Sequence, residues 1–434
     1  MAIPKLALIP STVGGSVYSV LPSNGDGDFD FTRASAATRI NAQGLIETVA
    51  VGDNRLNYPL IDGVVQGCPS LLLEPQRTNL ALYSEQFDNA AWTKSNSSIT
   101  ANTATSPDGY TNADKIVENT ATSGHTTFQS ISVTSGATYT ISAFGKAAER
   151  TRLWLDLYGG TNSANFDLSN GTILASSVGI TAKIENYGNG WYRCSITGVA
   201  PAATIYPNVG PTTSSTTDNQ YTGNGTDGLY LWGAQLELGS YPTSYIPNFG
   251  TALGVTRSAE TCNNAGNVNT FNDSEGVLFA EIAYLKDRGN SSPFKLERIS
   301  ISDSTDTNRL FISNTTNANE IQVFVRNAVG ISFNKTVTIS DNTLYNKIVL
   351  KYKANDFALW INGFELETDN TYSYVPSGLS VLKFQGASAG AYVFEGNTKQ
   401  IQYFDSALID SELETLTSWT SFSDMATSQL YSIQ

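Results

Sequence analysis

The sequence predicts an all-β protein: two antiparallel β-sandwich domains of the jelly-roll type, preceded by an extended N-terminal anchoring arm. Charged residues make up only 15% of the 434 residues. Thr, Asn, Ser and Gly replace them, and these residues suit pleated strands and turns with positive φ. Apolar residues alternate with period two in many segments, and no helical periodicity separates those segments. The length favours two or three domains.

Residues 1–78 are predicted to form the arm. Their short apolar pieces, such as Ile3–Ile9 and Val17–Leu21, are separated by Gly, Pro and Asp. A segment of this kind is expected to make few long-range contacts of its own and to become ordered by packing on a neighbour. We therefore expect it to fasten the rest of the chain to a larger assembly.

Residues 79–250 are predicted to form the first sandwich, because period-two strands alternate there with turns rich in Asn, Gly, Ser and Thr. Pro242, Pro247 and Gly250 mark its end. The clearest strand signals lie at Thr138–Phe144, Arg152–Tyr158, Trp191–Thr197 and Gly228–Trp232.

Residues 251–272 are predicted to be a linker, and residues 273–434 the second sandwich, with its first strand near Glu275–Ile282. Asn362-Gly363 stands between two alternating segments and predicts a hairpin, since a type I′ turn needs positive φ at both central residues. A strand at Lys399–Phe404 is followed by Ser411 and Glu414, which fit a capping box for a short closing helix.

Composition excludes several classes of function. The net charge is −14 without a cluster of Lys and Arg, so no nucleic-acid partner is expected. No apolar run approaches the roughly 20 residues that span a bilayer, so no membrane insertion is expected. The N-terminus does not resemble a signal peptide, which predicts synthesis in a cytoplasm without secretion. Three scattered cysteines, Cys68, Cys194 and Cys262, predict reduced thiols.

An enzyme is not expected. The single histidine, His125, lies in a polar segment that is typical of a loop, and no GxSxG-type elbow accompanies it. Hydrolysis of a glycoside needs two carboxylates across a cleft. Acidic residues are plentiful, for example Glu275, Glu281 and Glu297, but no ExDxE-type strand is present.

One candidate site is a glycan-binding face. In the strand 152–158, the leucines at 153, 155 and 157 share one side, since side chains alternate with period two. The other side carries an indole, a phenol, a guanidinium and a carboxylate, a mixture that suits stacking on a sugar. The alternative interpretation places these side chains half-buried under loops or at subunit contacts. The candidate glycan-binding residues are Arg152, Trp154, Asp156, Tyr158, Trp191 and Arg193.

A second candidate is a weak calcium site. Asp26, Asp28 and Asp30 place side-chain oxygens at every second position, and calcium takes six to eight oxygen ligands. The run lacks the bidentate Glu of an EF-hand loop. The alternative is a solvated turn that leads into Phe31. No other cofactor is predicted.

Three segments resemble proteins of the bacteriophage tail-fibre and head-fibre family. The first, Phe31–Asn41 followed by Gly44–Glu47, is similar to an N-terminal signature of such fibres. The second segment comprises Leu73–Leu80, Ser84–Phe87 and Trp92, and it resembles the start of the carbohydrate-module-like domain of such fibres. The third comprises Leu231–Glu237 and Tyr241–Pro247, and it resembles the end of that domain.

The C-terminal 150 or so residues resemble the concanavalin-A-like (laminin-G-like) sandwich that such proteins carry, through the Asn362-Gly363 hairpin and the segment Ile401–Ile409. The resemblance implies a virion structural protein, a head fibre, tail fibre or spike. It further implies a homotrimer that docks on other capsid or tail proteins through its N-terminal part and contacts host-surface glycans. The alternative is a free-standing carbohydrate-binding or glycan-depolymerising protein that shares the modules.

Overall fold

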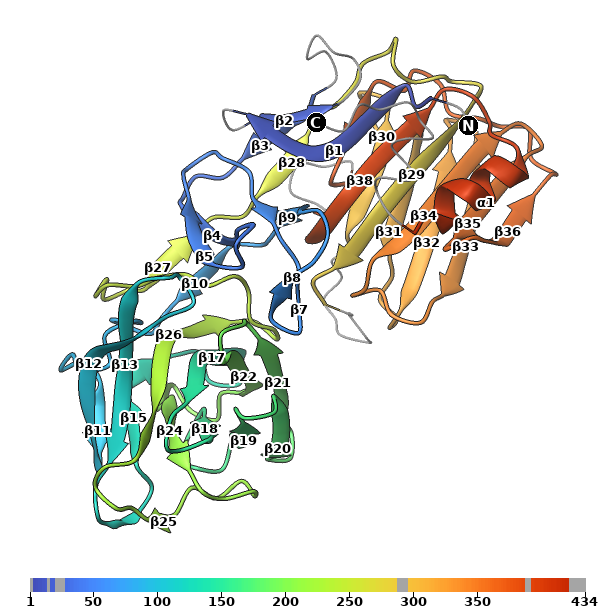
Figure 1. The fold of residues 1–434 in the computed structure, drawn as a ribbon. Coiled ribbons are helices and arrows are strands. Elements are labelled where there is room, and N and C mark those ends of the chain that lie inside the picture. Colours follow the sequence, from blue (N-terminus) through green and yellow to red (C-terminus); the bar gives the residue numbers. More distant parts are fainter. Residues whose placement is uncertain (1–2, 14–15, 20–27, 287–295, 387–391, 421–434) are drawn as a thin grey trace.

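The computed structural model describes residues 3–13, 16–19, 28–286, 296–386 and 392–420. Strands dominate these ranges, and their single helix is α1 (Asp410–Ser418). Figure 1 shows two stacks of strands, β11–β26 and β29–β38, with short N-terminal strands between them. The all-β class and the β-sandwich architecture predicted from the sequence are confirmed.

The first sandwich consists of two six-stranded antiparallel sheets. In spatial order, the first sheet contains β11 (Thr93–Ser95), β15 (Thr126–Phe128), β24 (Asn208–Thr212), β18 (Arg152–Asp156), β19 (Ser163–Asp167) and β20 (Thr172–Ser176). The second contains β12 (Ser97–Thr105), β13 (Thr111–Glu118), β26 (Gly228–Leu238), β17 (Thr138–Ala147), β22 (Trp191–Val199) and β21 (Thr181–Asn186). Two short pairs add β14 (Thr122–Ser123) with β25 (Tyr221–Thr222), and β16 (Ile131–Ser132) with β23 (Thr204–Ile205).

The core between these sheets follows the predicted alternation. Leu153 and Leu155 of β18 point inward and are fully buried, as are Leu229 and Leu231 of β26. The four strongest strand predictions of this region therefore coincide with β17, β18, β22 and β26. Alternation identifies such strands because successive side chains point to opposite faces of a sheet.

The second sandwich also has two sheets. Its larger sheet contains β2 (Ser16–Ser19), β1 (Leu6–Val13), β38 (Gly396–Phe404), β29 (Glu275–Tyr284), β34 (Asn346–Lys353), β35 (Phe357–Ile361) and β36 (Phe364–Asp369), with β9 (Ser70–Leu73) on β38 and β6 (Leu56–Asn57) on β9. Its smaller sheet contains β33 (Ile331–Thr338), β32 (Glu320–Arg326), β31 (Arg309–Asn314), β30 (Arg298–Ser302) and β37 (Val381–Lys383).

The predicted hairpin is confirmed, and the predicted helix cap is wrong. β35 and β36 are joined by Asn362 and Gly363, whose φ angles are 50° and 90°. The closing helix starts at Asp410 and its N-cap is Ile409, so Ser411 lies inside the helix. Glu412 Oε2 accepts a 3.4 Å hydrogen bond from the Ile409 N–H, the role that the sequence assigned to Glu414.

The described part of the N-terminal segment makes long-range strand pairings, which corrects the expectation that residues 1–78 have few long-range contacts of their own. β1 pairs with one end of β38 and β9 pairs with the other end, along the same edge. Leu6 and Leu8 of β1, and Leu71 and Leu73 of β9, are buried in the core of the second sandwich. The physical reason is that these short apolar pieces have the strand period, and β38 offers them an edge to pair with.

The segment 251–272 is not a loose linker either. It forms β27 (Val255–Arg257), which pairs with β10 (Arg77–Asn79), and β28 (Thr261–Asn263), which pairs with β3 (Asp30–Thr32). Two further hairpins stand nearby, β4 (Ala37–Ile40) with β5 (Ile46–Val49), and β7 (Leu60–Ile61) with β8 (Val64–Val65). Together with β6 and β9, these segments build the junction between the two sandwiches (Figure 1).

Candidate functional site

The expected glycan-binding face of β18 is covered. Trp154 is only 3% exposed and Asp156 is fully buried. The Trp154 Nε1–H donates a 3.0 Å hydrogen bond to the backbone oxygen of Thr217. Asn165 of the neighbouring strand also donates to the 216–218 segment. This segment therefore lies over the face, and the expectation that the indole is open to a sugar is wrong.

The remaining members of this face are held by local contacts. The Asp156 carboxylate accepts hydrogen bonds from the Gly160 and Asn162 N–H groups, at 2.9 and 3.2 Å, and burial raises its pKa. Arg152 and Tyr158 are half-buried, and Arg152 donates to the backbone oxygen of Thr213. These contacts fit the alternative interpretation, in which the polar tips are satisfied within the domain.

Trp191 and Arg193 lie in the second sheet of the same sandwich, away from β18. The Trp191 ring is buried, and its Nε1–H donates a 2.9 Å hydrogen bond to the Thr105 backbone oxygen. Arg193 is 3% exposed and donates to the Thr243 backbone oxygen at 2.7 Å and to Ser142 Oγ at 3.0 Å. The structure thus separates these two residues from the four on β18.

The calcium candidate stays a prediction. Asp26 lies outside the described residues. The carboxylate of Asp30, in β3, accepts a 2.9 Å hydrogen bond from Asn264 Nδ2. In the ranges that the structure describes, no group of three or more His, Cys, Asp or Glu side chains is placed to hold a metal ion. Asp28 and Asp30 alone do not provide six ligands.

His125 is buried rather than placed in an open loop. Its Nδ1 lies 2.7 Å from the Asn96 backbone oxygen, and its ring packs on Tyr221 with 4.6 Å between centroids. The ring therefore fills space beside β14 and β15 of the first sandwich.

A buried charge network at the junction escaped the sequence reasoning. Arg55 is fully buried and donates from Nη1 to Glu74 Oε2 at 2.7 Å, and from Nε to Glu260 Oε1 at 2.7 Å. Arg33 Nη1 donates to Glu260 Oε1 at 2.8 Å, and Arg257 Nη1 lies 2.7 Å from Glu74 Oε2. Five charged side chains from distant parts of the sequence thus form one connected set.

The electrostatics of Glu74 show how strongly this network is coupled. Burial alone would raise the pKa of Glu74, but Arg257, Arg55 and the hydrogen bonds from Ser244 outweigh burial and lower it to about 2. Ser244 donates to Glu74 from Oγ at 2.6 Å and from its backbone N at 2.8 Å. Opposite charges and hydrogen bonds to the ionised form account for the direction.

Three segments that the sequence analysis singled out, within residues 31–47, 73–92 and 231–247, meet at this network. Arg33 belongs to the first segment, Glu74 to the second and Ser244 to the third. Asn79 of the second segment also donates to the backbone oxygens of Ala234 and Ile246, at 3.0 and 2.7 Å, in the third. The segments were visible in the sequence, but their meeting point was not.

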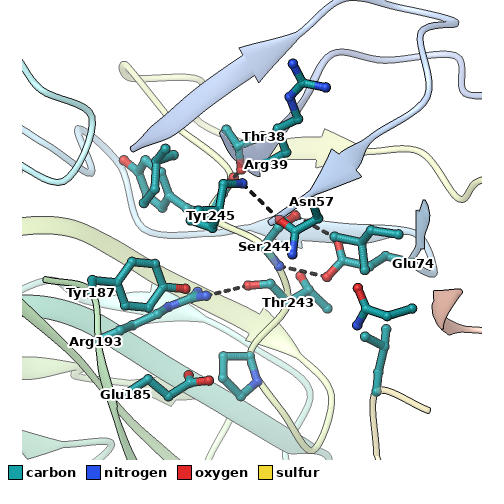
Figure 2. Close-up of a pocket in the computed structure, with 16 residues that line it drawn as sticks. Thr38, Arg39, Asn57, Glu74, Glu185, Tyr187, Arg193, Thr243, Ser244 and Tyr245 are labelled. Atoms are coloured by element: carbon teal, nitrogen blue, oxygen red, sulfur yellow. Dashed lines mark hydrogen bonds between the residues drawn. The ribbon is translucent and has the colours of Figure 1, made fainter. Parts of the chain in front are cut away.

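Next to the network lies a polar cavity of about 160 Å³. Three parts of the chain line it: the junction strands, the first sandwich and the second sandwich. Figure 2 shows Arg193 and Tyr187 on one side, with Glu74 and Asn57 across from them. The lining residues are Thr38, Arg39, Ile40, Ile46, Asn57, Leu72, Glu74, Glu185, Tyr187, Arg193, Pro242, Thr243, Ser244, Tyr245, Leu285 and Asn397.

The polar groups around this cavity are engaged with one another. Arg193 donates to Thr243, Ser244 donates to Glu74, and Thr38 Oγ1 donates a 2.5 Å hydrogen bond to the Tyr245 backbone oxygen (Figure 2). Such a site can orient water or a small polar molecule, and the hydrogen bonds around it link residues 243–245 to the first sandwich and to the junction strands. We therefore regard the junction, rather than β18, as the principal functional feature of the chain.

Glu85, in the second of these segments, is predicted to make stability depend on pH. Burial raises its pKa to about 7, with Asp108 adding to the effect and the Tyr245 hydrogen bond opposing it. The folded pKa of Glu85 exceeds the ordinary value of 4.5. The stabilisation of the folded state that results from this shift is therefore fully present below pH 4.5, and it is lost as pH rises through about 7. Urea unfolding of wild type and Glu85→Gln, below, within and above this window, measures it. If the difference in unfolding free energy between wild type and Glu85→Gln does not change with pH, the prediction is contradicted.

In the part of the chain that the structure describes, no helix is both long and apolar enough to cross a membrane.

No protein-family model matches the sequence, and a search of curated proteins finds no significant similarity. Several solved structures are similar in part. The CBM40 of the Ruminococcus gnavus IT-sialidase is 15% identical, covering 36% of this chain and 94% of its own, with a TM-score of 0.30.

Two larger proteins match over a longer part of the chain. Domains LG4-5 of the mouse laminin alpha1 chain are 8% identical, covering 67% of this chain and 90% of their own, with a TM-score of 0.23. The Trypanosoma rangeli sialidase is 10% identical, covering 70% of this chain and 66% of its own, with a TM-score of 0.27. Similarities this low do not establish a shared function.

Proposed function

We propose that this protein is a non-catalytic structural component of a bacteriophage particle, a head fibre, tail fibre or spike that presents two β-sandwiches to a host surface. The observation that carries the proposal is the junction. Arg33, Glu74 and Ser244, one from each fibre-like segment, are brought into a single buried network between the sandwiches.

The junction suits a protein that must hold two domains in a fixed orientation. Its charges are buried, and each Arg faces a carboxylate at hydrogen-bonding distance. Removing one partner from such a network leaves an uncompensated charge, so the network resists partial opening. A fixed orientation lets several copies on one particle engage a surface together, and weak sites then gain avidity through effective concentration. We propose a homotrimer as the unit that supplies these copies.

The sequence suggested that an N-terminal arm attaches the protein to the particle, but the N-terminal strands are part of a folded domain. β1 and β9 are strands of the second sandwich, and Phe29 is buried in the same core. We therefore propose that a surface of the folded domains contacts the other capsid or tail proteins.

Immunogold electron microscopy tests this function. Particles are purified from lysates of cells infected with the phage whose genome encodes the chain, and are labelled with antibody against the recombinant protein. We expect gold on an appendage, and no gold when the antibody is first absorbed with that protein. A protein found only in the soluble fraction, with unlabelled particles, contradicts the proposal.

A free-standing carbohydrate-binding protein is the second candidate. It is favoured by three partly exposed aromatic rings near the end of β18, since such rings can stack on sugars. The centroids of Tyr158 and Tyr206 lie 5.9 Å apart, and those of Phe128 and Tyr206 lie 6.3 Å apart. The labelling experiment separates the candidates, because a free-standing protein is not found on particles.

A further inference from the structure

The smaller sheet of the second sandwich has an unusual outer face. Its inward side chains, such as Ile299, Leu310, Val323 and Leu382, are buried in the core. Because side chains alternate along a strand, their neighbours point outward. Four of these neighbours are cationic, one on each of four adjacent strands: Arg298 on β30, Arg309 on β31, Arg326 on β32 and Lys383 on β37. These four residues are here called the cationic face.

Arg298 is held flat between two aromatic rings. Its guanidinium carbon lies 4.1 Å from the Phe311 centroid and 4.0 Å from the Tyr392 centroid. The Arg298 backbone N–H donates a 3.0 Å hydrogen bond to the Tyr392 backbone oxygen, which holds the Tyr392 backbone beside β30. Phe311 is in turn stacked on Phe324, with 4.8 Å between centroids. The guanidinium is thus positioned by stacking, and its N–H groups point out from its edge.

Of the three guanidiniums of the cationic face, that of Arg309 is partly engaged, because its Nη1 donates a 2.5 Å hydrogen bond to the Asp306 backbone oxygen. The Nε atoms of Arg298, Arg309 and Arg326 are buried without a hydrogen-bond partner in the described chain. Among the described residues, Arg298 and Arg326 take part in no ion pair, whereas the Asp306 carboxylate lies 3.4 Å from Arg309 Nη1 and 3.7 Å from Lys383 Nζ. A guanidinium that has no ion-pair partner in the described chain, as with Arg298 and Arg326, is suited to contact with an added carboxylate or sulfate.

The arrangement also places two like charges opposite each other. Arg309 and Arg326 are directly paired across β31 and β32. Like charges directly opposite each other in an antiparallel sheet are destabilising. This pairing stands in a chain whose net charge is −14, so it is not the result of a generally basic composition. The Asp306 carboxylate pairs with only one of these two arginines, Arg309, and an anion bound beside Arg326 would reduce the repulsion that remains.

We propose that the cationic face binds an acidic polysaccharide. Strands lie about 4.8 Å apart, so four adjacent strands spread the cations over roughly 14 Å, a length that several sugar residues cover. The anionic groups of the sugar pair with the guanidiniums, and Tyr392, which is 36% exposed, offers a ring to a sugar face. A DNA duplex, the other common polyanion, is the alternative ligand that the experiment below includes.

The proposed function includes adhesion to a host surface, and this inference names the class of ligand for that adhesion. It rests on the proposed function only for the biological role of the binding. Isothermal titration of the purified full chain tests it with polygalacturonate, dextran sulfate, neutral dextran and a DNA duplex. We expect binding of at least one acidic polysaccharide and none of dextran or DNA. The first two probes distinguish carboxylate from sulfate recognition. Because no phage particle is involved, this result is independent of the gold labelling.

The test variant combines Arg298→Met with Arg326→Met. The matched control combines Lys183→Met with Lys353→Met, which removes the same amount of charge from exposed sites outside the cationic face. We expect at least a tenfold loss of affinity in the first pair and less than twofold in the second. Arg326→Gln alone serves if the double variant fails to fold, since Arg326 has no ion pair to lose in the described chain. Equal losses in both pairs, equal binding of DNA, or no binding of either acidic polysaccharide overturns the proposal.

Discussion

Replacing Arg55 by Met is expected to lower the free energy of unfolding by roughly 3–5 kcal/mol, the range for breaking a buried ion pair. Arg55 is fully buried and bonds to both Glu74 and Glu260. The variant leaves the Glu74 and Glu260 carboxylates short of a partner at buried positions. Guanidinium chloride unfolding measures the loss.

Arg39→Met is the matched control. Arg39 lies in the same junction, but its pair with Glu47 is partly exposed, at 26% and 37% for the two side chains. Exposed pairs contribute about 0–1 kcal/mol, so the control should lose no more than that. Small-angle scattering adds a second measurement, since we expect the Arg55 variant to show a wider range of orientations between the sandwiches. Equal losses in both variants would mean that the network does not hold the junction.

Leu8→Ala is expected to cost about 2–5 kcal/mol, as for other buried leucines. Leu8 lies in β1, pairs with Ile401 of β38 and is fully buried in the core of the second sandwich. Truncation removes apolar contacts and leaves a cavity. Urea unfolding, followed by tryptophan fluorescence, measures the change.

Ile3→Ala is the control for this second prediction. Ile3 is 56% exposed and precedes the strand, so its truncation should change stability by less than about 0.5 kcal/mol. If Leu8→Ala is as mild as the control, the N-terminal segment behaves as the free arm that the sequence suggested. A large difference means that deleting the segment would damage the second sandwich, rather than merely detach it from a particle.

The sequence identified individual strands well where the signal is local. Alternation in Arg152–Tyr158 located β18, and Asn362-Gly363 located the β35–β36 hairpin. It failed for the face of β18, because whether Trp154 is open depends on a loop 63 residues further along the chain. It failed for the capping of α1 because the N-cap is Ile409, an apolar residue that carries no capping signal in the sequence.

The junction shows the same limit on a larger scale. The charged residues Arg33, Arg55 and Glu74 are ordinary when seen singly, and the sequence contains nothing that pairs them. Arg55 and Glu260, which bond directly, stand 205 positions apart. Only the fibre-like resemblance drew attention to Arg33 and Glu74, and it gave them no role.

The sequence alone determined the all-β class, the positions of the main strands and the turn that closes the clearest hairpin, because period-two alternation and turn chemistry act between neighbouring residues. The tertiary structure alone decided that β1 and β9 complete the second sandwich, that Trp154 is covered, and that Arg298 and Arg326 share one outer face. These outcomes depend on which strand edges and charges meet across hundreds of residues, and local patterns do not encode that pairing.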